Sequence, residues 1–354
     1  MKFLDKFKKD SKAGGGITTS DADPTWFIST GNYLFNKILS GKYLGGIPQG
    51  MTSLLAGASS SGKSFIAGNL IREAQEMGFG ILVVDSERAL TKQFVKNIGA
   101  NPDAEDYVYR GVTTIANAVK VVSSFLQAYR ESGETKPVLI VIDSLDAMLT
   151  EAQLKAYNEG EQKGEMGQQV RQLKALMAPL TQDIKDLNIA IVATKQVYRD
   201  QDPIKQKNPV TEFKITDAIQ YAFTIIGLVS KLMLKNETTK QYEGIHLRVF
   251  GFKTRFTAPF QKASIQVPYN GGMDPFSGLL EAAEALGVVK RAKGSSWYEF
   301  EGTKFQAKNF NTVQDDLLKK LIELEDKDVI NVTPDSDLYI DSNDESAQGV
   351  ASEE

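Results

Sequence analysis

The sequence predicts an α/β fold with a mainly parallel central sheet, and three observations carry this prediction. From about residue 25, short apolar runs alternate with longer segments of helical periodicity. The run VLIVI (138–142) is apolar without a break, as expected of a parallel strand that is covered on both faces. The turn GASSSGKS (57–64) separates a strand-like segment from a helix-like one.

The expected elements follow in chain order. Strands are expected at residues 51–56, 80–87, 138–145 and 189–197. Helices are expected at residues 62–78, about 114–132 and about 167–187. Strand-rich sequence then covers 221–269, and a small helical part, GLLEAAEALG, follows Asp274 and Pro275.

One stretch of the strand-rich part, FKTRFTAPF (252–260), places two cations in an apolar and aromatic run. Alternation along a strand would put Lys253 and Arg255 on one face. Two neighbouring cations on a buried strand are costly unless an anion meets them. We therefore expect an anionic partner, either carboxylates of the same chain or a group from another molecule.

The chain divides into four expected regions. Residues 1–24 form an arm and linker, in which Phe3, Leu4 and Phe7 share one helical face and could contact another subunit. The core covers 25–270, and a small C-terminal α+β part covers 271–333. Residues 334–354 carry seven acids and no Lys or Arg, which predicts a disordered tail. The tail either solvates the protein or competes with a polyanion for a basic surface, since the rest of the chain holds 41 basic against 38 acidic residues.

The composition excludes several kinds of site. The chain has 354 residues but no cysteine, which excludes disulfides and thiolate metal sites and fits an intracellular setting. The single histidine, His246, lies in a strand-like run, and a structural role is expected because one imidazole cannot build a metal site. No apolar run reaches the roughly 18–20 residues of a membrane span, and the start lacks the apolar core of a signal peptide. A cytoplasmic location is therefore expected.

The turn GASSSGKS matches the phosphate-binding pattern GxxxxGK[ST] at every fixed position. Glycines at 57 and 62 allow a tight turn, and the N–H groups of residues 60–64 would face an anion at a helix N-terminus. Lys63 would reach the β- and γ-phosphates, and Ser64 would bind Mg²⁺. The alternative is an ordinary Ser/Gly-rich turn. The expected nucleotide-binding residues of this loop are Gly57, Ser60, Ser61, Gly62, Lys63 and Ser64.

Three further strand ends carry polar residues that suit phosphate chemistry. Asp143 follows the apolar run and would bind Mg²⁺ next to Ser144, although a helix N-cap and an ordinary turn residue are the alternatives. Asp85 and Glu87 are expected on one face of the strand end VVDSERAL, with Glu87 orienting the attacking water. Gln196 ends IVATKQVY and could contact the γ-phosphate; the alternative is a plain polar strand end.

These pieces, in this order, resemble the RecA family of recombinases, and within it the phage UvsX-type branch. The resemblance covers about residues 29–310 and includes ISTGNYLFNKILSGKYLGGIPQG, VVDSERAL, FKTRFTAPFQKASIQVPYNGGMDPFSGLL and GSSWYEFEGTKFQAKNF. It implies a RecA-like P-loop ATPase core that uses ATP and Mg²⁺, with Glu87 as the catalytic glutamate, Phe94 stacking on adenine and Gln196 sensing the nucleotide. Two positions depart from the family: Thr91 replaces an Asp near the base, and Lys195 replaces an Asn.

The resemblance also implies where DNA and neighbouring subunits bind. Two loops, about 151–166 and about 197–216, would hold DNA, and the second lacks the family's glycine cluster. Its expected DNA-binding residues are Arg199, Lys205, Lys207, Phe213 and Lys214, with Tyr198 as a further aromatic, unless the loop is simply a solvated charged one. Lys253 and Arg255 would reach the nucleotide of the adjacent subunit.

The function that the resemblance implies is an ATP-dependent DNA strand-exchange recombinase. It would form helical filaments on single-stranded DNA, pair this DNA with homologous duplex, and serve recombination, repair and replication. A mediator and a single-stranded-DNA-binding protein are expected partners, and the location would be the cytoplasm of a bacterial host if a phage encodes the chain. The alternatives are a hexameric replicative helicase on the same core and a DNA-pairing scaffold in which ATP only locks assembly.

Overall fold

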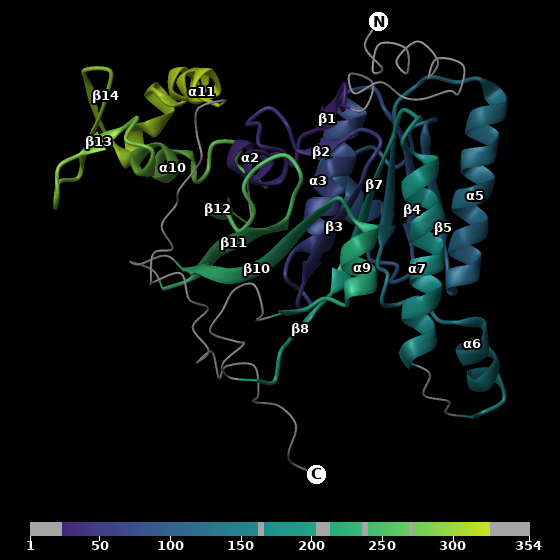
Figure 1. The fold of residues 1–354 in the computed structure, drawn as a ribbon. Helices are drawn as coiled ribbons and strands as arrows, with labels where there is room; N and C mark the ends of the chain where they lie inside the picture. Colours follow the sequence, from purple (N-terminus) through teal and green to yellow (C-terminus); the bar gives the residue numbers. More distant parts are fainter. Residues whose placement is uncertain (1–22, 162–165, 203–212, 236–239, 269–271, 326–354) are drawn as a thin grey trace, which may run out of the picture.

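The computed structural model describes residues 23–161, 166–202, 213–235, 240–268 and 272–325. Within these residues, eight strands form the central sheet in the order β12-β11-β10-β3-β7-β6-β4-β5 (Figure 1). In that order the strands are β12 (Lys262–Pro268), β11 (Tyr242–Lys253), β10 (Ile225–Lys235), β3 (Thr52–Gly57), β7 (Ile189–Gln196), β6 (Val138–Asp143), β4 (Gly80–Asp85) and β5 (Tyr107–Gly111). The strands from β10 to β5 run parallel, and β11 and β12 extend the sheet antiparallel. The predicted fold class is confirmed.

Helices cover both faces of this sheet (Figure 1). One face packs against α2 (Tyr33–Ser40), α3 (Lys63–Glu76) and α4 (Lys92–Asn97) in a first core that includes Ile66, Leu70 and Leu247. The other face packs against α5 (Ile115–Ser132), α7 (Met166–Asp183) and α9 (Asp217–Ala222) in a second core that includes Val122, Met177 and Ile219.

The uninterrupted apolar run of β6 follows from this two-sided cover. Leu139 and Val141 point into the first core, whereas Ile140 and Ile142 point into the second. Because successive side chains of a strand alternate between faces, a strand buried on both sides needs apolar residues at every position. The polar residue that ends the run, Asp143, therefore emerges at the carboxyl edge of the sheet, beside the ends of β3, β4 and β7.

The first predicted DNA loop, about 151–166, is not a loop over its first half. Residues 162–165 lie outside the described residues, and the binding of DNA by this segment stays a prediction. Helix α6 covers Glu151–Asn158. Thr150 accepts a hydrogen bond from the N–H of Gln153, and the Gln153 side chain accepts one from the N–H of Thr150. This capping box satisfies donors that the first turn of a helix leaves unpaired, so the segment begins a helix directly after the turn that follows β6.

A third core lies in the C-terminal part. It includes Leu279, Phe300, Phe305 and Leu317, with Tyr43 contributed from the loop after α2. Its elements are α10 (Leu279–Ala285), β13 (Lys290–Arg291), β14 (Trp297–Phe300), β15 (Thr303–Gln306), η3 (Ala307–Thr312) and α11 (Gln314–Glu323). The arm residues Phe3, Leu4 and Phe7 and the tail 334–354 lie outside the described residues. None of the helices described is both long and apolar enough to cross a membrane.

The strand predicted for 252–260 is also wrong beyond its first residues. Strand β11 ends at Lys253, and Arg255 lies in a bend. The Thr254 hydroxyl donates to the carbonyl of Leu39 at 2.8 Å and accepts from the N–H of Phe256 at 3.2 Å. A threonine that bonds its local backbone in this way offers an alternative to the strand ladder. Lys253 and Arg255 therefore do not share a strand face.

Candidate functional site

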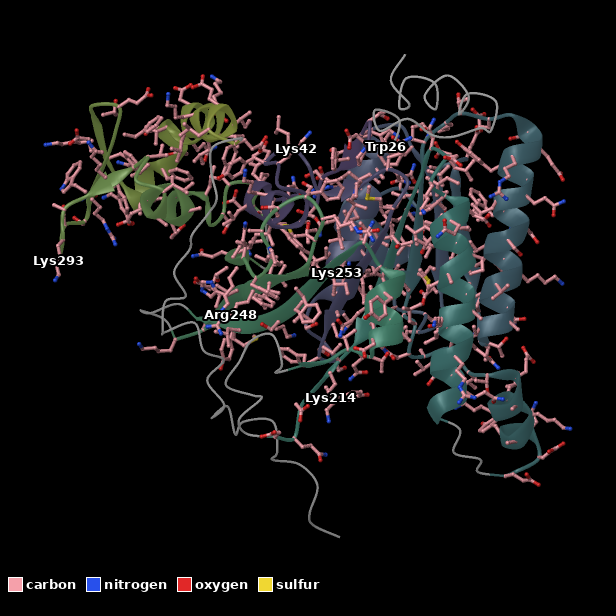
Figure 2. The ribbon with its side chains drawn as sticks, viewed as in Figure 1. Trp26, Lys42, Lys214, Arg248, Lys253 and Lys293 are labelled. Atoms are coloured by element: carbon pink, nitrogen blue, oxygen red, sulfur yellow. The ribbon has the colours of Figure 1, made fainter. Side chains whose placement is uncertain are left out.

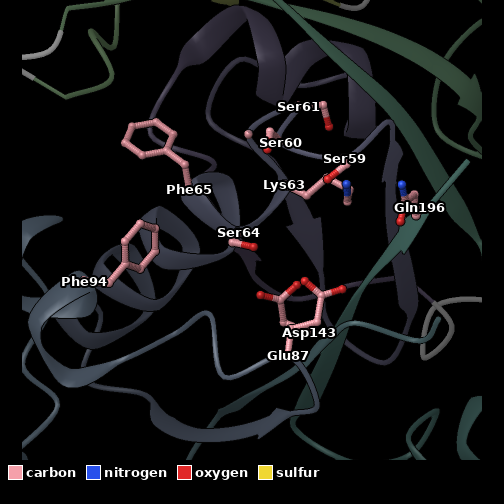
Figure 3. A pocket seen from close by; sticks show the side chains of 11 residues that line it. Ser59, Ser60, Ser61, Lys63, Ser64, Phe65, Glu87, Phe94, Asp143 and Gln196 are labelled. Atoms are coloured by element: carbon pink, nitrogen blue, oxygen red, sulfur yellow. The ribbon is translucent and has the colours of Figure 1, made fainter. Parts of the chain in front are cut away.

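A pocket of about 280 Å³ opens at the carboxyl edge of the parallel strands (Figure 3). The loop after β3 supplies most of its wall, and residues that follow or end β4, β6 and β7 supply the rest. It is lined by Ser59, Ser60, Ser61, Gly62, Lys63, Ser64, Phe65, Glu87, Phe94, Asp143 and Gln196. Parallel α/β sheets commonly bind ligands at this edge. The structure thus brings together predicted residues from four segments that are far apart in the sequence.

The loop between β3 and α3 has the geometry that its glycines predict. A Cβ on Gly57 would stand 2.2 Å from the carbonyl oxygen of Val229, so only glycine fits there. Gly62 has a φ of 101°, a conformation that side chains disfavour. It precedes α3 directly, so the first N–H groups of this helix face the pocket, as an anion site requires. The binding of a phosphate by this loop stays a prediction.

Lys63 lies in the same pocket and is half-buried. Its ammonium donates to the carbonyl oxygens of Gly57 at 3.1 Å and of Ala58 at 2.7 Å. Burial lowers the pKa of Lys63, and the charges of Glu87, Asp143 and Asp146 oppose that effect. A lysine on the first turn of α3 with acids on the opposite wall suits a phosphate that is shared with a cation.

Asp143 is 1% exposed and has the chemistry of a cation ligand. The Thr194 hydroxyl donates to its Oδ1, and the Ser64 hydroxyl lies close enough to lower the pKa of this carboxyl. Its Oδ2 is buried and has no hydrogen-bond partner among the described residues. Burial raises the pKa of Asp143, and the nearby Asp85 and Glu87 add to this, so a cation would relieve the cost of its charge.

The residues at this point fit Mg²⁺ rather than a metal held by protein groups alone. In the described part of the chain, no three His, Cys, Asp or Glu side chains gather around a common point. Mg²⁺ in phosphate sites typically takes one or two protein ligands and completes its shell with phosphate oxygens and water. Ser64 and Asp143 match this pattern. The alternative of a helix N-cap fails for Asp143, because the next helix, α6, is capped by Thr150.

Glu87 and Ser144 are joined across two strand ends. The Ser144 hydroxyl donates to Oε1 of Glu87. The Ser86 hydroxyl donates to the Ser144 carbonyl at 2.7 Å and accepts from the Ser144 N–H at 3.1 Å. Ser144 is therefore not an ordinary turn residue. These bonds fix the Glu87 carboxylate beside Asp143, in a position to hold a water molecule.

Asp85 does not share a face with Glu87, contrary to the prediction. Strand β4 ends at Asp85, whose side chain is fully buried. Its Oδ1 accepts from the N–H groups of Glu87 at 3.0 Å, Arg88 at 2.6 Å and Ala89 at 3.4 Å. Its Oδ2 accepts from the N–H of Leu90 at 3.0 Å and from the Tyr109 hydroxyl at 3.1 Å. This carboxylate folds the backbone into a tight turn, and the turn carries Glu87 into the pocket.

Gln196 lines the pocket and is tied to the turn after β6. Its N–H donates to Oδ2 of Asp146 at 2.6 Å, and the Lys195 ammonium pairs with Oδ1 of the same carboxylate. The predictions did not include Asp146, Thr194 or Ser86. No motif marks Asp146, and Thr194 and Ser86 each adjoin a predicted strand end without a pattern of their own.

Lys253 lies beside α9 and does not line the pocket (Figure 2). Its ammonium donates to the carbonyl oxygens of Gln220 at 2.6 Å and Phe223 at 2.7 Å. Burial lowers the pKa of Lys253, and the neighbouring charge of Arg255 adds to the effect. The cation thus meets carbonyl oxygens near the C-terminal end of α9, where the helix dipole is negative. Its action on a neighbouring subunit stays a prediction.

Two short paired strands lie within the second predicted DNA loop, about 197–216. Strand β8 (Tyr198–Arg199) pairs antiparallel with β9 (Phe213–Lys214). Tyr198 is 68% exposed, and the exposed Lys214 lies 3.5 Å from the Asp200 carboxylate. Phe213 packs partly buried against the second core, and its contact with DNA stays a prediction. Lys205 and Lys207 lie outside the described residues, and Arg199 is placed in β8.

Comparison with known proteins points to one family. The model of the RecA N-terminal domain matches residues 7–274 of this chain. Protein RecA of Thermus aquaticus is 27% identical over 258 residues, which is 73% of this chain and 71% of that protein. Protein RecA of Ectopseudomonas oleovorans is 28% identical over 301 residues, 85% of this chain and 80% of that protein. Protein RecA of Haemophilus ducreyi is 26% identical over 337 residues, 92% of this chain and 85% of that protein.

Proposed function

The chain belongs to the RecA family, and from this premise we propose that it is an ATP-dependent DNA strand-exchange recombinase of the phage UvsX type. It would assemble as a helical filament on single-stranded DNA, with ATP and Mg²⁺ bound, and pair that DNA with homologous duplex. Its roles would be recombination, repair and recombination-dependent replication. A mediator and a single-stranded-DNA-binding protein would assist it, in the cytoplasm of the bacterial host.

The observation that carries this proposal is the pocket in which Lys63, Asp143, Glu87 and Gln196 converge. Lys63 and the N–H groups at the start of α3 would bind the phosphates of ATP. Ser64 and Asp143 would hold Mg²⁺, which would neutralise charge on the phosphate oxygens. Ser144 holds Glu87 in place, and Glu87 would orient the attacking water and accept its proton.

The pocket is close in sequence to the loop that would bind DNA. Gln196 ends β7, and the ribbon β8–β9 begins two residues later. Asp146 binds both Lys195 and the backbone of Gln196, so the turn after β6 and the end of β7 would move together when the γ-phosphate is lost. Hydrolysis would weaken the grip on DNA. It would not supply energy for each base pair, because exchanging one duplex for a similar one is nearly balanced.

Lys253 and Arg255 would act on the ATP of the adjacent subunit. In the single chain, Lys253 is held by two backbone carbonyls and lies outside the pocket that contains Glu87. A cation held by neutral groups can exchange them for a phosphate, which binds it more strongly. The pair would then stabilise transition-state charge in trans, as arginine fingers do.

The experiment that tests the function is phosphate release by the full chain with Mg²⁺ and ATP, with and without single-stranded DNA. We expect strong stimulation by the DNA, its loss in Lys63→Ala, and slow turnover with intact nucleotide binding in Glu87→Gln. DNA binding with no hydrolysis would instead indicate a pairing scaffold. Electron microscopy of the same samples separates the remaining alternative, since closed rings would indicate a helicase and helical filaments a recombinase. The relatives named RecA favour the second outcome.

A further inference from the structure

The pocket has an aromatic end that the phosphate chemistry does not use. Phe65 and Phe94 both line it, and Figure 3 shows their rings on the same side of Ser64, away from Gln196 and the two carboxylates. Both side chains are only partly buried, and both pack against the first core. A ring that is anchored on one side and open to a pocket on the other is a stacking surface.

The sequence explains why two rings meet here. Phe65 directly follows Ser64 on the first turn of α3, so it lies next to the phosphate loop. Phe94 comes from α4, which packs closely on α3 at Gly68. A Cβ on Gly68 would stand 2.4 Å from Cδ1 of Ile98 and 3.6 Å from Cε1 of Phe94. Glycine at this position therefore lets α4 bring the Phe94 ring to the first turns of α3.

Figure 3 shows Glu87, Asp143 and Gln196 on the far side of Ser64 from the two rings, and the other polar side chains that line the pocket are on the phosphate loop and the first turn of α3. Thr91 is close in sequence to Phe94, but its hydroxyl oxygen accepts the N–H of Phe94 at 3.2 Å and caps α4. In the described part of the chain, the lining thus offers the aromatic end two ring faces and no hydrogen-bonding side chain.

We propose that Phe65 is a further base-binding residue, which forms a two-ring slot for the base of the nucleotide together with Phe94, the residue that the family resemblance already places on adenine. Stacking recognises the aromatic face that every base has, whereas hydrogen bonds to ring edges distinguish one base from another. The slot therefore selects a purine by its stacking area and discriminates weakly among purine nucleoside triphosphates. This inference rests on the proposed binding of ATP by the phosphate loop.

The test measures nucleotide binding by the full chain without DNA, with calorimetry and slowly hydrolysed analogues of ATP, GTP and inosine triphosphate. Phe65→Leu keeps an apolar side chain of similar bulk but removes the ring. We expect it to raise the Kd of all three analogues on the order of 10-fold, as loss of one stacking partner does. Inorganic tripolyphosphate, which has no base, should bind the variant and the wild type equally.

Two further variants separate stacking from packing. Phe125→Leu removes a partly buried ring on the second core, far from the pocket, and should leave all Kd values unchanged. Phe65→Trp should give a fluorescence signal that changes on addition of the nucleotide analogues and not on addition of tripolyphosphate. This signal reports contact between ring and base, which a purely structural role for Phe65 would not produce.

Three results would overturn the inference. Phe65→Leu could bind the ATP analogue as the wild type does, or it could lose tripolyphosphate affinity to the same extent. The wild type could prefer ATP to both other purine triphosphates by more than about 100-fold, which would require hydrogen bonds to the base edge. Failure of the proposed function gives a different pattern, because the wild type would then bind neither ATP nor tripolyphosphate, or would bind both without hydrolysis on DNA.

Discussion

Replacing Asp85 with Asn tests whether this buried carboxylate positions the catalytic turn. The amide has one acceptor oxygen where the carboxylate has two. If that oxygen keeps the three N–H groups that Oδ1 now accepts, the new NH₂ group faces the N–H of Leu90 and the Tyr109 hydroxyl. The Tyr109 hydroxyl can turn and accept a hydrogen bond. The N–H of Leu90, a residue that is 1% exposed, has no such choice.

The magnitude follows from these bonds. A buried donor left without an acceptor costs about 1–3 kcal/mol, and losing the charge weakens the remaining bonds by roughly 1 kcal/mol in total. We therefore expect Asp85→Asn to lower the free energy of unfolding by about 2–4 kcal/mol. Arg88 has a φ of 57°, a conformation that costs a non-glycine residue about 1–2 kcal/mol, so a weakened turn will relax. Relaxation moves Glu87 away from Ser144.

The assay measures kcat and the Kd for ATP separately. Misplacing a catalytic group by about 1 Å can cost roughly 100-fold in rate, so we expect kcat to fall between about 10- and 100-fold. The Kd should stay within about threefold, because Asp85 does not line the pocket. Tyr109→Phe is the matched control: it removes only the bond at 3.1 Å and should leave kcat nearly unchanged. A folded Asp85→Asn variant with wild-type kcat would refute the positioning role.

Three further predictions concern other parts of the chain. Burial, with the nearby Tyr109 and Asp85, raises the pKa of Tyr107 to about 12, so the wild type should lose stability as the pH rises from about 10 to 12. Tyr107→Phe should lose less stability over that range, although not none, because the pKa values of Tyr109 and Tyr129 are also raised by burial. An equal loss of stability in the two proteins would be the contrary result. In filaments that mix a Lys253→Ala, Arg255→Ala subunit with a Glu87→Gln subunit, ATP hydrolysis should recover although neither protein is active alone; no recovery would exclude action in trans. Deleting residues 334–354 removes seven negative charges, so nucleation on duplex DNA should be faster at low salt, and identical binding curves would leave the tail a solvating segment.

The features predicted correctly from the sequence are those that short segments determine. The phosphate loop is specified by its own glycines and by the strand and helix beside it. The buried strands are specified by uninterrupted apolar runs such as 138–142. Helix α6 was missed although its signal was present, since Thr150 and Gln153 have the spacing of a capping box.

The remaining features depend on contacts between distant segments. The bend at Thr254 forms because its hydroxyl meets the carbonyl of Leu39, more than two hundred residues earlier. Asp146 belongs to the site because its carboxylate, in the turn after β6, accepts the N–H of Gln196 at the end of β7, and the sequence does not show this contact. An apolar residue on a helix, such as Phe65, carries no sign of whether it faces a core or a ligand, because both settings favour the same side chain.

The most direct test of the central claim is a strand-exchange measurement with the purified full chain. The reaction contains circular single-stranded DNA, a linear duplex, Mg²⁺ and ATP, and joint molecules are separated by gel electrophoresis. We predict joint molecules with a homologous duplex, none with a heterologous duplex of equal length, and none with Lys63→Ala. Joint molecules formed equally with both duplexes, or duplex unwound without pairing, would contradict the assignment as a recombinase.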